Sequence, residues 1–208
     1  MFAEQTKELE NGLKSNLIKL KSKVEERNWI MLEKLNITLE QVDLEELPQF
    51  TKKLQEAFSI AVKEKFGTNE PVPSEKEIQE SFHSEGTEIY HIGLNGNRVG
   101  GAVLTIDKKT QHNFLDLFFI SPEHHSRDLG FAAWKAIEVK YPDTTVWETI
   151  TPYFEERNIH FYINKCGFHI VEFFNERHID PNMSRPQNQS GELVPGTDTY
   201  FRFEKVMK

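Results

Sequence analysis

The polar residues between Pro122 and Leu129 stand where a protein chain can hold an anion. An apolar, aromatic-rich run over residues 113–120 precedes them and predicts a buried strand, which Pro122 ends because proline donates no hydrogen bond to a sheet. From Leu129 onward, small and apolar residues recur at helical spacing. A strand, a tight turn and a helix N-terminus bring free backbone amides and the helix dipole to one place. The sequence therefore predicts an anion-binding turn over residues 121–132.

Other reactive side chains form weaker patterns. His124 and His125 precede Asp128, which suggests a metal, but no His-x-x-x-His or cysteine pair accompanies them, so we expect no metal site. Cys166 is the single cysteine, so the chain forms no intrachain disulfide. It falls at the end of an expected helix with no base positioned by the sequence, and a core position is a better interpretation than a nucleophile.

Periodicity and turn residues predict the elements around this turn. Asn95 and Gly96 predict a type I′ hairpin, because both turn positions need positive φ. Ser74 and Glu77 have the capping-box pattern and predict the start of a short helix. Thr151 before Pro152 predicts the start of another helix, and Gly167 predicts its end. Strands are expected over residues 35–42, 89–94, 98–106, 113–120, 144–149, 168–174 and 199–206, and helices over 47–66, 74–82, 129–141 and 152–165.

Length and charge restrict the domain organisation and the partners. With 208 residues the chain has room for one domain and an appendage, and we divide it into a helical N-terminal extension (1–34) and a domain (35–208). A formal charge of −8 and a pI near 5.5 argue against a general nucleic-acid binder and favour a cationic partner. No apolar run reaches membrane-spanning length and the first residues lack a signal-peptide pattern, so we expect a cytoplasmic protein without membrane contact.

The N-terminal extension carries a leucine stripe. Its members recur at helical spacing and are Leu9, Leu13, Leu17, Leu20 and Val24. Such a stripe must bury itself against another apolar surface. It either packs on the domain of its own chain or forms a dimerisation helix, so a homodimer is one of two alternatives.

The order of these elements, together with three motifs, resembles the GNAT superfamily of acetyl-CoA-dependent N-acetyltransferases. The motifs are the hairpin with Val99, Gly100 and Gly101, the strand, proline, turn and helix over 114–138, and the sequence FYINKCGF at 161–168. The resemblance extends over residues 35–207. It implies an α/β (α+β) fold, in which helices flank a twisted, mixed and mostly antiparallel central sheet.

The turn aligns with the family's Q/R-x-x-G-x-G/A pattern in two registers. The first places His125, Asp128 and Gly130 on the pattern and keeps the spacing to Pro122 and Glu138. The second falls on Arg127, Gly130 and Ala132 and fits letter for letter. We favour the first. The carboxylate of Asp128 then either repels the pyrophosphate of coenzyme A or is a first-turn acid that points to solvent.

The resemblance implies three coenzyme-binding segments. The strand end at Phe119 and Ile120 would bind the pantetheine arm, and a backbone amide there would hold the thioester oxygen. Asn158 would bind the arm or a water molecule, although the family's common asparagine aligns with Glu155. The turn residues implied in pyrophosphate binding are His125, Ser126, Arg127, Asp128, Leu129, Gly130, Phe131 and Ala132.

The resemblance also implies the catalytic groups. Tyr162 would be the general acid for the leaving thiolate, since a phenol stays protonated at neutral pH. Tyr162 also shares an apolar helical stripe with Ile159 and Ile163, so packing is the alternative role. Asp116 and Glu148 are candidate general bases on strands beside the expected cleft, and a water chain is the alternative to both.

The expected function is acetyl transfer from acetyl-CoA to a primary amine by direct attack in a ternary complex. The acceptor would be a small-molecule or peptide amine that the sequence does not name. A non-catalytic acyl-CoA-binding or protein-interaction module is the alternative, because His125 and Asp128 depart from the family pattern. The long polar passage over residues 175–198 is expected to shape the acceptor pocket.

Overall fold

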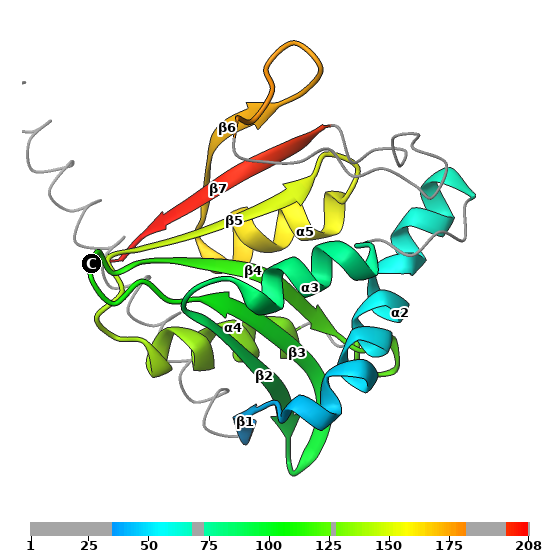
Figure 1. Cartoon of the computed structure of the whole chain (residues 1–208), viewed down its shortest axis with the longest axis vertical. Helices are drawn as coiled ribbons and strands as arrows, with labels where there is room; N and C mark the ends of the chain where they lie inside the picture. Colours follow the sequence, from blue (N-terminus) through cyan, green and yellow to red (C-terminus); the bar gives the residue numbers. More distant parts are fainter. Residues whose placement is uncertain (1–34, 68–72, 126–127, 182–198, 208) are drawn as a thin grey trace, which may run out of the picture. The chain divides into compact units, whose positions relative to one another are not determined.

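The structure is a computed structural model that describes residues 35–67, 73–125, 128–181 and 199–207 (Figure 1). The chain divides into two units, Met1–Asn36 and Ile37–Lys208, and every element below belongs to the second. The predicted helical extension with its leucine stripe, and most of the long polar passage, lie outside the described residues. Among those residues, no helix is both long and apolar enough to cross a membrane.

The described strands form one mixed sheet in the order β1-β2-β3-β4-β5-β7-β6. Neighbouring strands are antiparallel, except for β4 and β5, which are parallel. The strands are β1 (Ile37–Gln41), β2 (Thr87–Leu94), β3 (Asn97–Thr105), β4 (His112–Ile120), β5 (Val146–Pro152), β6 (His169–Phe174) and β7 (Tyr200–Val206). The predicted mixed, mostly antiparallel sheet is confirmed.

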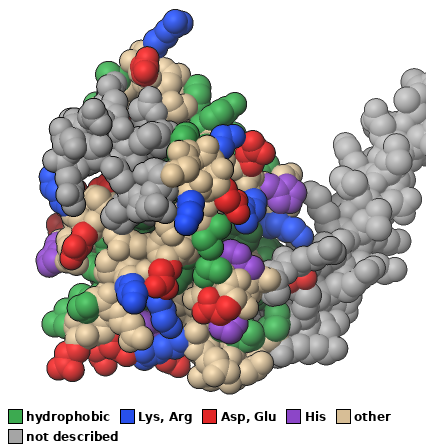
Figure 2. Space-filling view, turned by 90° about the vertical axis from the view of Figure 1, so that its right-hand side faces the viewer, with side chains coloured by type: hydrophobic (Ala, Val, Ile, Leu, Met, Phe, Trp, Pro, Cys, Tyr) green, Lys and Arg blue, Asp and Glu red, His purple; other side chains and the backbone are tan. Residues whose placement is uncertain are grey.

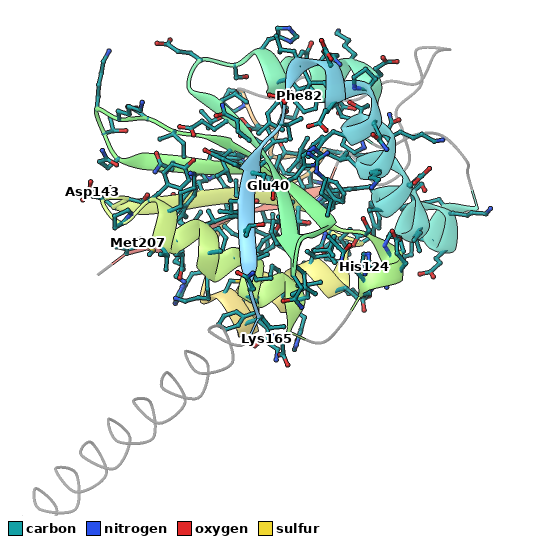
Figure 3. All side chains as sticks on the ribbon, turned by 90° about the horizontal axis from the view of Figure 1, so that it is seen from below. Glu40, Phe82, His124, Asp143, Lys165 and Met207 are labelled. Atoms are coloured by element: carbon teal, nitrogen blue, oxygen red, sulfur yellow. The ribbon has the colours of Figure 1, made fainter. Side chains whose placement is uncertain are left out.

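Helices cover both faces of this sheet, as the view from below shows (Figure 3). The α-helices are α2 (Leu47–Phe66), α3 (Glu75–His83), α4 (Leu129–Lys140) and α5 (Glu156–His160). A π-helix, η3 (Phe161–Cys166), continues α5, and two short 3-10 helices are η1 (Leu44–Glu46) and η2 (Pro122–His124). Phe82 of α3 and Lys165 of η3 lie on opposite sides of the sheet (Figure 3).

Each face has its own apolar core, because alternate strand residues point in opposite directions. Phe50 and Leu54 of α2 and Ile78 of α3 pack against Val103 and Phe119 on one face. On the other face, the rings of Trp134 in α4 and Trp147 in β5 meet edge to face, with centroids 5.4 Å apart. The small residues predicted to let α4 lie close to the sheet, Ala132 and Ala133, are buried there.

The predicted turn and cap signals are found at several positions. Asn95 and Gly96 have φ of 51° and 83° and join β2 to β3, as a type I′ turn requires. Ser74 caps α3 in a capping box, in which the Ser74 N–H donates to the Glu77 carboxylate at 2.8 Å. Gly167, with φ of 80°, ends η3.

The predicted start of the helix at Pro152 is wrong. The backbone continues as strand β5 through Pro152, and α5 begins only at Glu156. Thr151, predicted as the cap, is instead 3% exposed and paired with Phe201 of β7. Pairing with β7 therefore overrides the local cap signal, and a proline is tolerated at Pro152 because it is the last position of this ladder.

Candidate active site

The central feature of the site is the divergence of β4 and β5. The two strands pair over three residues each, His112–Phe114 of β4 with Val146–Glu148 of β5. Past these residues the edge of β4 has no strand partner on this side in the described chain. Side chains donate hydrogen bonds to two backbone carbonyls of β4. Thr149 donates to the carbonyl of Leu115 at 2.9 Å, and His125 donates to that of Ile120 at 2.8 Å.

A pocket of about 550 Å³ opens at the end of β4. Its lining includes three consecutive strand residues, Phe118, Phe119 and Ile120. Because successive side chains of a strand point to opposite faces, the pocket reaches both faces of the sheet. The other lining residues are Ala57, Phe58, Ile60 and Ala61 of α2, His125, Gly130 and Phe131 of the turn and α4, and Glu155, Glu156, Arg157, Asn158, His160, Phe161 and Tyr162 of the next helical segment. On the face in Figure 2, hydrophobic side chains show between charged and histidine side chains.

Two glycines of β3 position the end of β4. A Cβ atom on Gly100 would lie 2.2 Å from the carbonyl oxygen of Phe119, and one on Gly101 would lie 2.3 Å from the ring of Phe50. Both distances are far below van der Waals contact. The absence of side chains at Gly100 and Gly101 therefore lets β4 and α2 approach β3 closely, which brings Phe119 to the pocket.

The turn brings only part of the predicted anion site to the pocket. His125, Gly130 and Phe131 line it, whereas Leu129 and Ala132 are buried in the core. Since a carbonyl oxygen can only accept, His125 donates through Nε2–H to Ile120, which fixes the ring across the end of β4. Gly130 stands close to Phe161, because a Cβ there would lie 3.4 Å from that ring.

Asp128 stands at the N-cap of α4, outside the lining of the pocket. Its side chain makes no capping hydrogen bond, so nothing in the described chain turns the carboxylate toward the helix N-terminus. Ser126 and Arg127, which were also predicted to bind the pyrophosphate, lie outside the described residues. Both roles considered for Asp128, repulsion of the pyrophosphate and a first-turn acid that points to solvent, stay predictions.

Tyr162 combines a packed ring with a place in the pocket wall. It is 6% exposed, and its ring contacts those of Phe161, Phe168 and Phe203 at centroid distances of 5.5, 5.5 and 5.6 Å. Its hydroxyl interacts with the side chain of Thr149. Burial is the main cause that raises the pKa of the phenol, so the hydroxyl keeps its proton at neutral pH.

The hydroxyl of Thr149 links Tyr162 to β4. Thr149 Oγ1 donates its proton to the Leu115 carbonyl at 2.9 Å and also interacts with the Tyr162 hydroxyl. Leu115 is the residue directly after the last paired residue of β4. Thr149 therefore bridges the first gap between the diverging strands and holds the phenol beside it.

The predicted stripe around Tyr162 is only partly correct. Ile163 is 37% exposed, whereas Cys166 is 2% exposed. The chain is a π-helix over these residues, which has more residues per turn than an α-helix and so moves Ile163 off the buried stripe. Asn158 does line the pocket, together with Glu155.

The two candidate bases, Asp116 and Glu148, lie outside the lining of this pocket. Asp116 lies at an irregularity where the β3–β4 register shifts, and its carboxylate accepts from Thr105 Oγ1 at 2.8 Å. Burial raises the pKa of Asp116 to about 6. Within the described residues, the Glu148 carboxylate contacts His112 at 3.0 Å and Arg202 at 3.9 Å, and neither of these residues lines the pocket.

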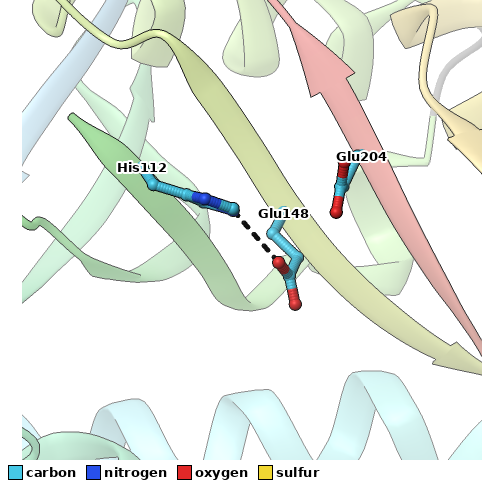
Figure 4. Close-up of side chains that lie close together, drawn as sticks. All are labelled: His112, Glu148 and Glu204. Atoms are coloured by element: carbon cyan, nitrogen blue, oxygen red, sulfur yellow. Dashed lines mark hydrogen bonds and ion pairs between the residues drawn. The ribbon is translucent and has the colours of Figure 1, made fainter. Parts of the chain in front are cut away.

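Glu148 belongs to a polar cluster on the sheet with His112 and Glu204 (Figure 4). Their ligand-type atoms lie within 4.8 Å of one another, and Arg202 approaches Glu148 at 3.9 Å. A histidine and two carboxylates are groups that divalent metals bind. Sequence spacing could not reveal this cluster, because only the strand order β4-β5-β7 brings residues so distant in the chain together.

Comparison with known proteins identifies the class of protein to which this site belongs. The model of the acetyltransferase (GNAT) family matches residues 50–168, so the chain belongs to that family. An uncharacterized protein of Bacillus subtilis (strain 168), YrkN, is 55% identical over 174 residues, which are 83% of this chain and 94% of YrkN.

Solved structures share the fold at low sequence identity. The ribosomal-protein-S18-alanine N-acetyltransferase of Escherichia coli aligns with a TM-score of 0.58 and 13% identity, over 83% of this chain and 94% of its own. A GNAT family acetyltransferase of Elizabethkingia anophelis, solved with acetyl-CoA bound, aligns with a TM-score of 0.57 and 15% identity, over 83% of this chain and 99% of its own. The predicted family and its fold are confirmed.

Proposed function

We propose that the protein transfers an acetyl group from acetyl-CoA to a primary amine, which attacks the thioester directly in a ternary complex. The observation that carries the proposal is the shared pocket, because the end of β4, the turn before α4 and Tyr162 all line it. The acceptor would be a small-molecule or peptide amine. A cytoplasmic location without nucleic-acid or membrane partners is part of the proposal, as is a homodimer if the leucine stripe pairs two chains.

The described residues suit an acyl-CoA in three respects. The unpaired edge of β4 can hydrogen-bond to an amide-containing arm, as a neighbouring strand would. Phe118, Phe131 and Phe161 supply apolar surface along the same pocket. The N-terminus of α4, twelve residues long, offers amides and a favourable dipole for phosphate.

Each predicted residue has a role in this proposal. Phe119 and Ile120 would hold the pantetheine arm and the thioester oxygen through their backbone, and Asn158 would contact the arm. The turn residues from His125 to Ala132 would hold the pyrophosphate. Tyr162 would donate its proton to the thiolate.

Turnover of acetyl-CoA with a panel of primary amines tests the proposal. We expect amine-dependent release of coenzyme A by the full chain, detected through its free thiol. The second candidate is a non-catalytic acyl-CoA-binding module, which the aspartate at Asp128 favours. Thermal stabilisation by acetyl-CoA without turnover of any amine would support that candidate and refute the transferase.

A further inference from the structure

The pocket contains few groups that can take a proton from an acceptor amine. Asp116 and Glu148 lie outside its lining, and the carboxylates within the described lining belong to Glu155 and Glu156. Glu156 is exposed, whereas Glu155 is partly buried. Among the residues that the structure describes, Glu155 is therefore the one pocket carboxylate that is partly shielded from water.

Backbone contacts hold Glu155 in place. Its N–H donates to the carbonyl of Pro152 at 3.1 Å, and its carbonyl accepts from the N–H of Ile159 at 3.0 Å. The preceding residue, Phe154, packs edge to face against Phe66 at the end of α2, with ring centroids 4.9 Å apart. Glu155 is thus fixed between β5, α2 and α5 before any ligand binds.

The side chain of Glu155, in contrast, has no hydrogen-bond or ion-pair partner among the residues that the structure describes. It stands at the N-cap of α5 but does not cap that helix, and no hydrogen bond or ion pair to its carboxylate occurs within the described residues. The guanidinium of Arg157 pairs with Glu64 of α2 instead, at 3.3 Å. An unpaired carboxylate that has lost part of its hydration is unfavourable, so a cation entering the pocket would be stabilised beside it.

The electrostatic surroundings suit a proton acceptor. Burial raises the pKa of Glu155 above its ordinary value, while Arg157 lowers it and Glu64 raises it. Glu155 in turn contributes to the raised pKa of Tyr162, so the two side chains interact electrostatically. The remaining titratable groups that line the pocket are His125, Glu156 and His160. A base is more effective when its pKa moves toward the working pH.

We propose that the Glu155 carboxylate binds the ammonium group of the acceptor and takes its proton before the amine attacks the thioester. This inference rests on the proposed function and assigns its general base. The ammonium group gives one proton to Glu155, and the neutral nitrogen then forms a bond to the acetyl carbon. As the carbon–sulfur bond breaks, the thiolate takes the proton of Tyr162. The surplus proton on the nitrogen returns to Tyr162 through water, leaving an amide, a thiol and one proton on Glu155.

The test compares the wild type with three variants, Glu155→Gln, Asp116→Asn and Glu56→Gln. Acetyl-CoA is the donor, and n-butylamine, phenethylamine and Nα-acetyl-lysine are the acceptor probes. Glu56→Gln is the matched control, because it removes the same charge from a side chain of α2 that is 60% exposed and outside the pocket lining. Melting temperature and acetyl-CoA affinity show whether each variant is folded and binds the donor.

We expect Glu155→Gln to lower kcat/KM about 10²-fold near neutral pH, the lower end for general-base catalysis. The deficit should shrink toward pH ~10, because an alkylamine then loses its proton without help. Acetyl-CoA affinity, melting temperature and the Glu56→Gln control should stay at wild-type values. This pH-dependent recovery would separate a base from a residue that only shapes the pocket.

Three results would overturn the inference. Wild-type kcat/KM in Glu155→Gln would remove the residue from the reaction, most clearly if Asp116→Asn showed the pH-dependent deficit instead. An equal loss of acetyl-CoA affinity would make Glu155 a donor-binding residue. A wild-type protein that acetylates none of the probes would refute the proposed transferase itself, which distinguishes that failure from a wrong choice of base.

Discussion

Replacing Tyr162 with phenylalanine removes one hydroxyl from the pocket wall and leaves the ring in place. The ring accounts for the packing, since it contacts Phe161, Phe168 and Phe203. The hydroxyl contributes at most one hydrogen bond, to Thr149. Thr149 keeps its own bond to Leu115 after the substitution, so no buried donor is left unpaired.

The cost to stability is therefore that of one neutral hydrogen bond. Such a bond contributes about 0.5–1.5 kcal/mol net. A loss near 1 kcal/mol lowers the melting temperature of a protein of this size by about 2–4 °C. The fold and the donor site of Tyr162→Phe should thus remain intact at assay temperature.

The expected cost to catalysis is larger. General-acid assistance is typically worth about 10²–10⁴ in rate, or roughly 3–5 kcal/mol of barrier. We therefore expect kcat of Tyr162→Phe to fall at least tenfold, with acetyl-CoA affinity within about twofold of the wild type. Steady-state rates from the released thiol, together with calorimetric titration of acetyl-CoA, measure both quantities.

Two threonine variants control for loss of a buried hydroxyl. Thr149→Val removes the partner of Tyr162 but not its proton, so kcat should fall less than in Tyr162→Phe. Thr151→Val removes a hydroxyl from a residue of the same strand that is similarly buried, since Thr151 is 3% exposed and Thr149 is 1% exposed. This variant should leave kcat unchanged. A kcat for Tyr162→Phe within about threefold of the wild type would make Tyr162 a packing residue and refute the proposed general acid.

Three further outcomes follow from other parts of the structure. Asp128→Gly should tighten acetyl-CoA binding by up to roughly 1–2 kcal/mol if the carboxylate opposes the pyrophosphate, and unchanged calorimetric affinity would refute that repulsion. Gly101→Ala should destabilise the fold by about 1–3 kcal/mol, because the new Cβ meets the Phe50 ring, and an unchanged urea midpoint would contradict this. Asp116→Asn should stabilise the protein above pH ~6, where the buried carboxylate ionises unfavourably, by at most about 3 kcal/mol, and this gain should vanish as the pH falls below ~4. Equal urea stability of Asp116→Asn and the wild type at neutral pH would contradict the raised pKa.

Local signals in the sequence predicted well wherever the local backbone decides the structure. Asn95 and Gly96 must adopt positive φ to close their hairpin, and Ser74 with Glu77 completes a cap within one helical turn. Neither requires information from elsewhere in the chain. The order of the elements along the chain was predicted from such signals, and the type of sheet from the family resemblance.

The failures arise where distant contacts decide. Thr151 and Pro152 carry a helix-start signal, yet pairing with β7 keeps them in the strand. The π-helix moves Ile163 to the surface, because it has more residues per turn than the α-helix that the predicted stripe assumes. Glu155 aligned with an asparagine of the family pattern, and only the pocket geometry shows it as a carboxylate without a partner.

The divergence of β4 and β5 explains why Glu148, a candidate base from the sequence, does not line the pocket. Glu148 and Thr149 are adjacent in β5, so their side chains leave opposite faces of the sheet. Thr149 faces Tyr162, and Glu148 faces His112. A carboxylate at Glu148 thus lies beside the last paired residues of β4, before the strands separate, whereas the pocket begins after they separate. The carboxylates that line the pocket within the described residues, Glu155 and Glu156, come from the segment that follows β5, and we propose the partly buried one, Glu155, as the base.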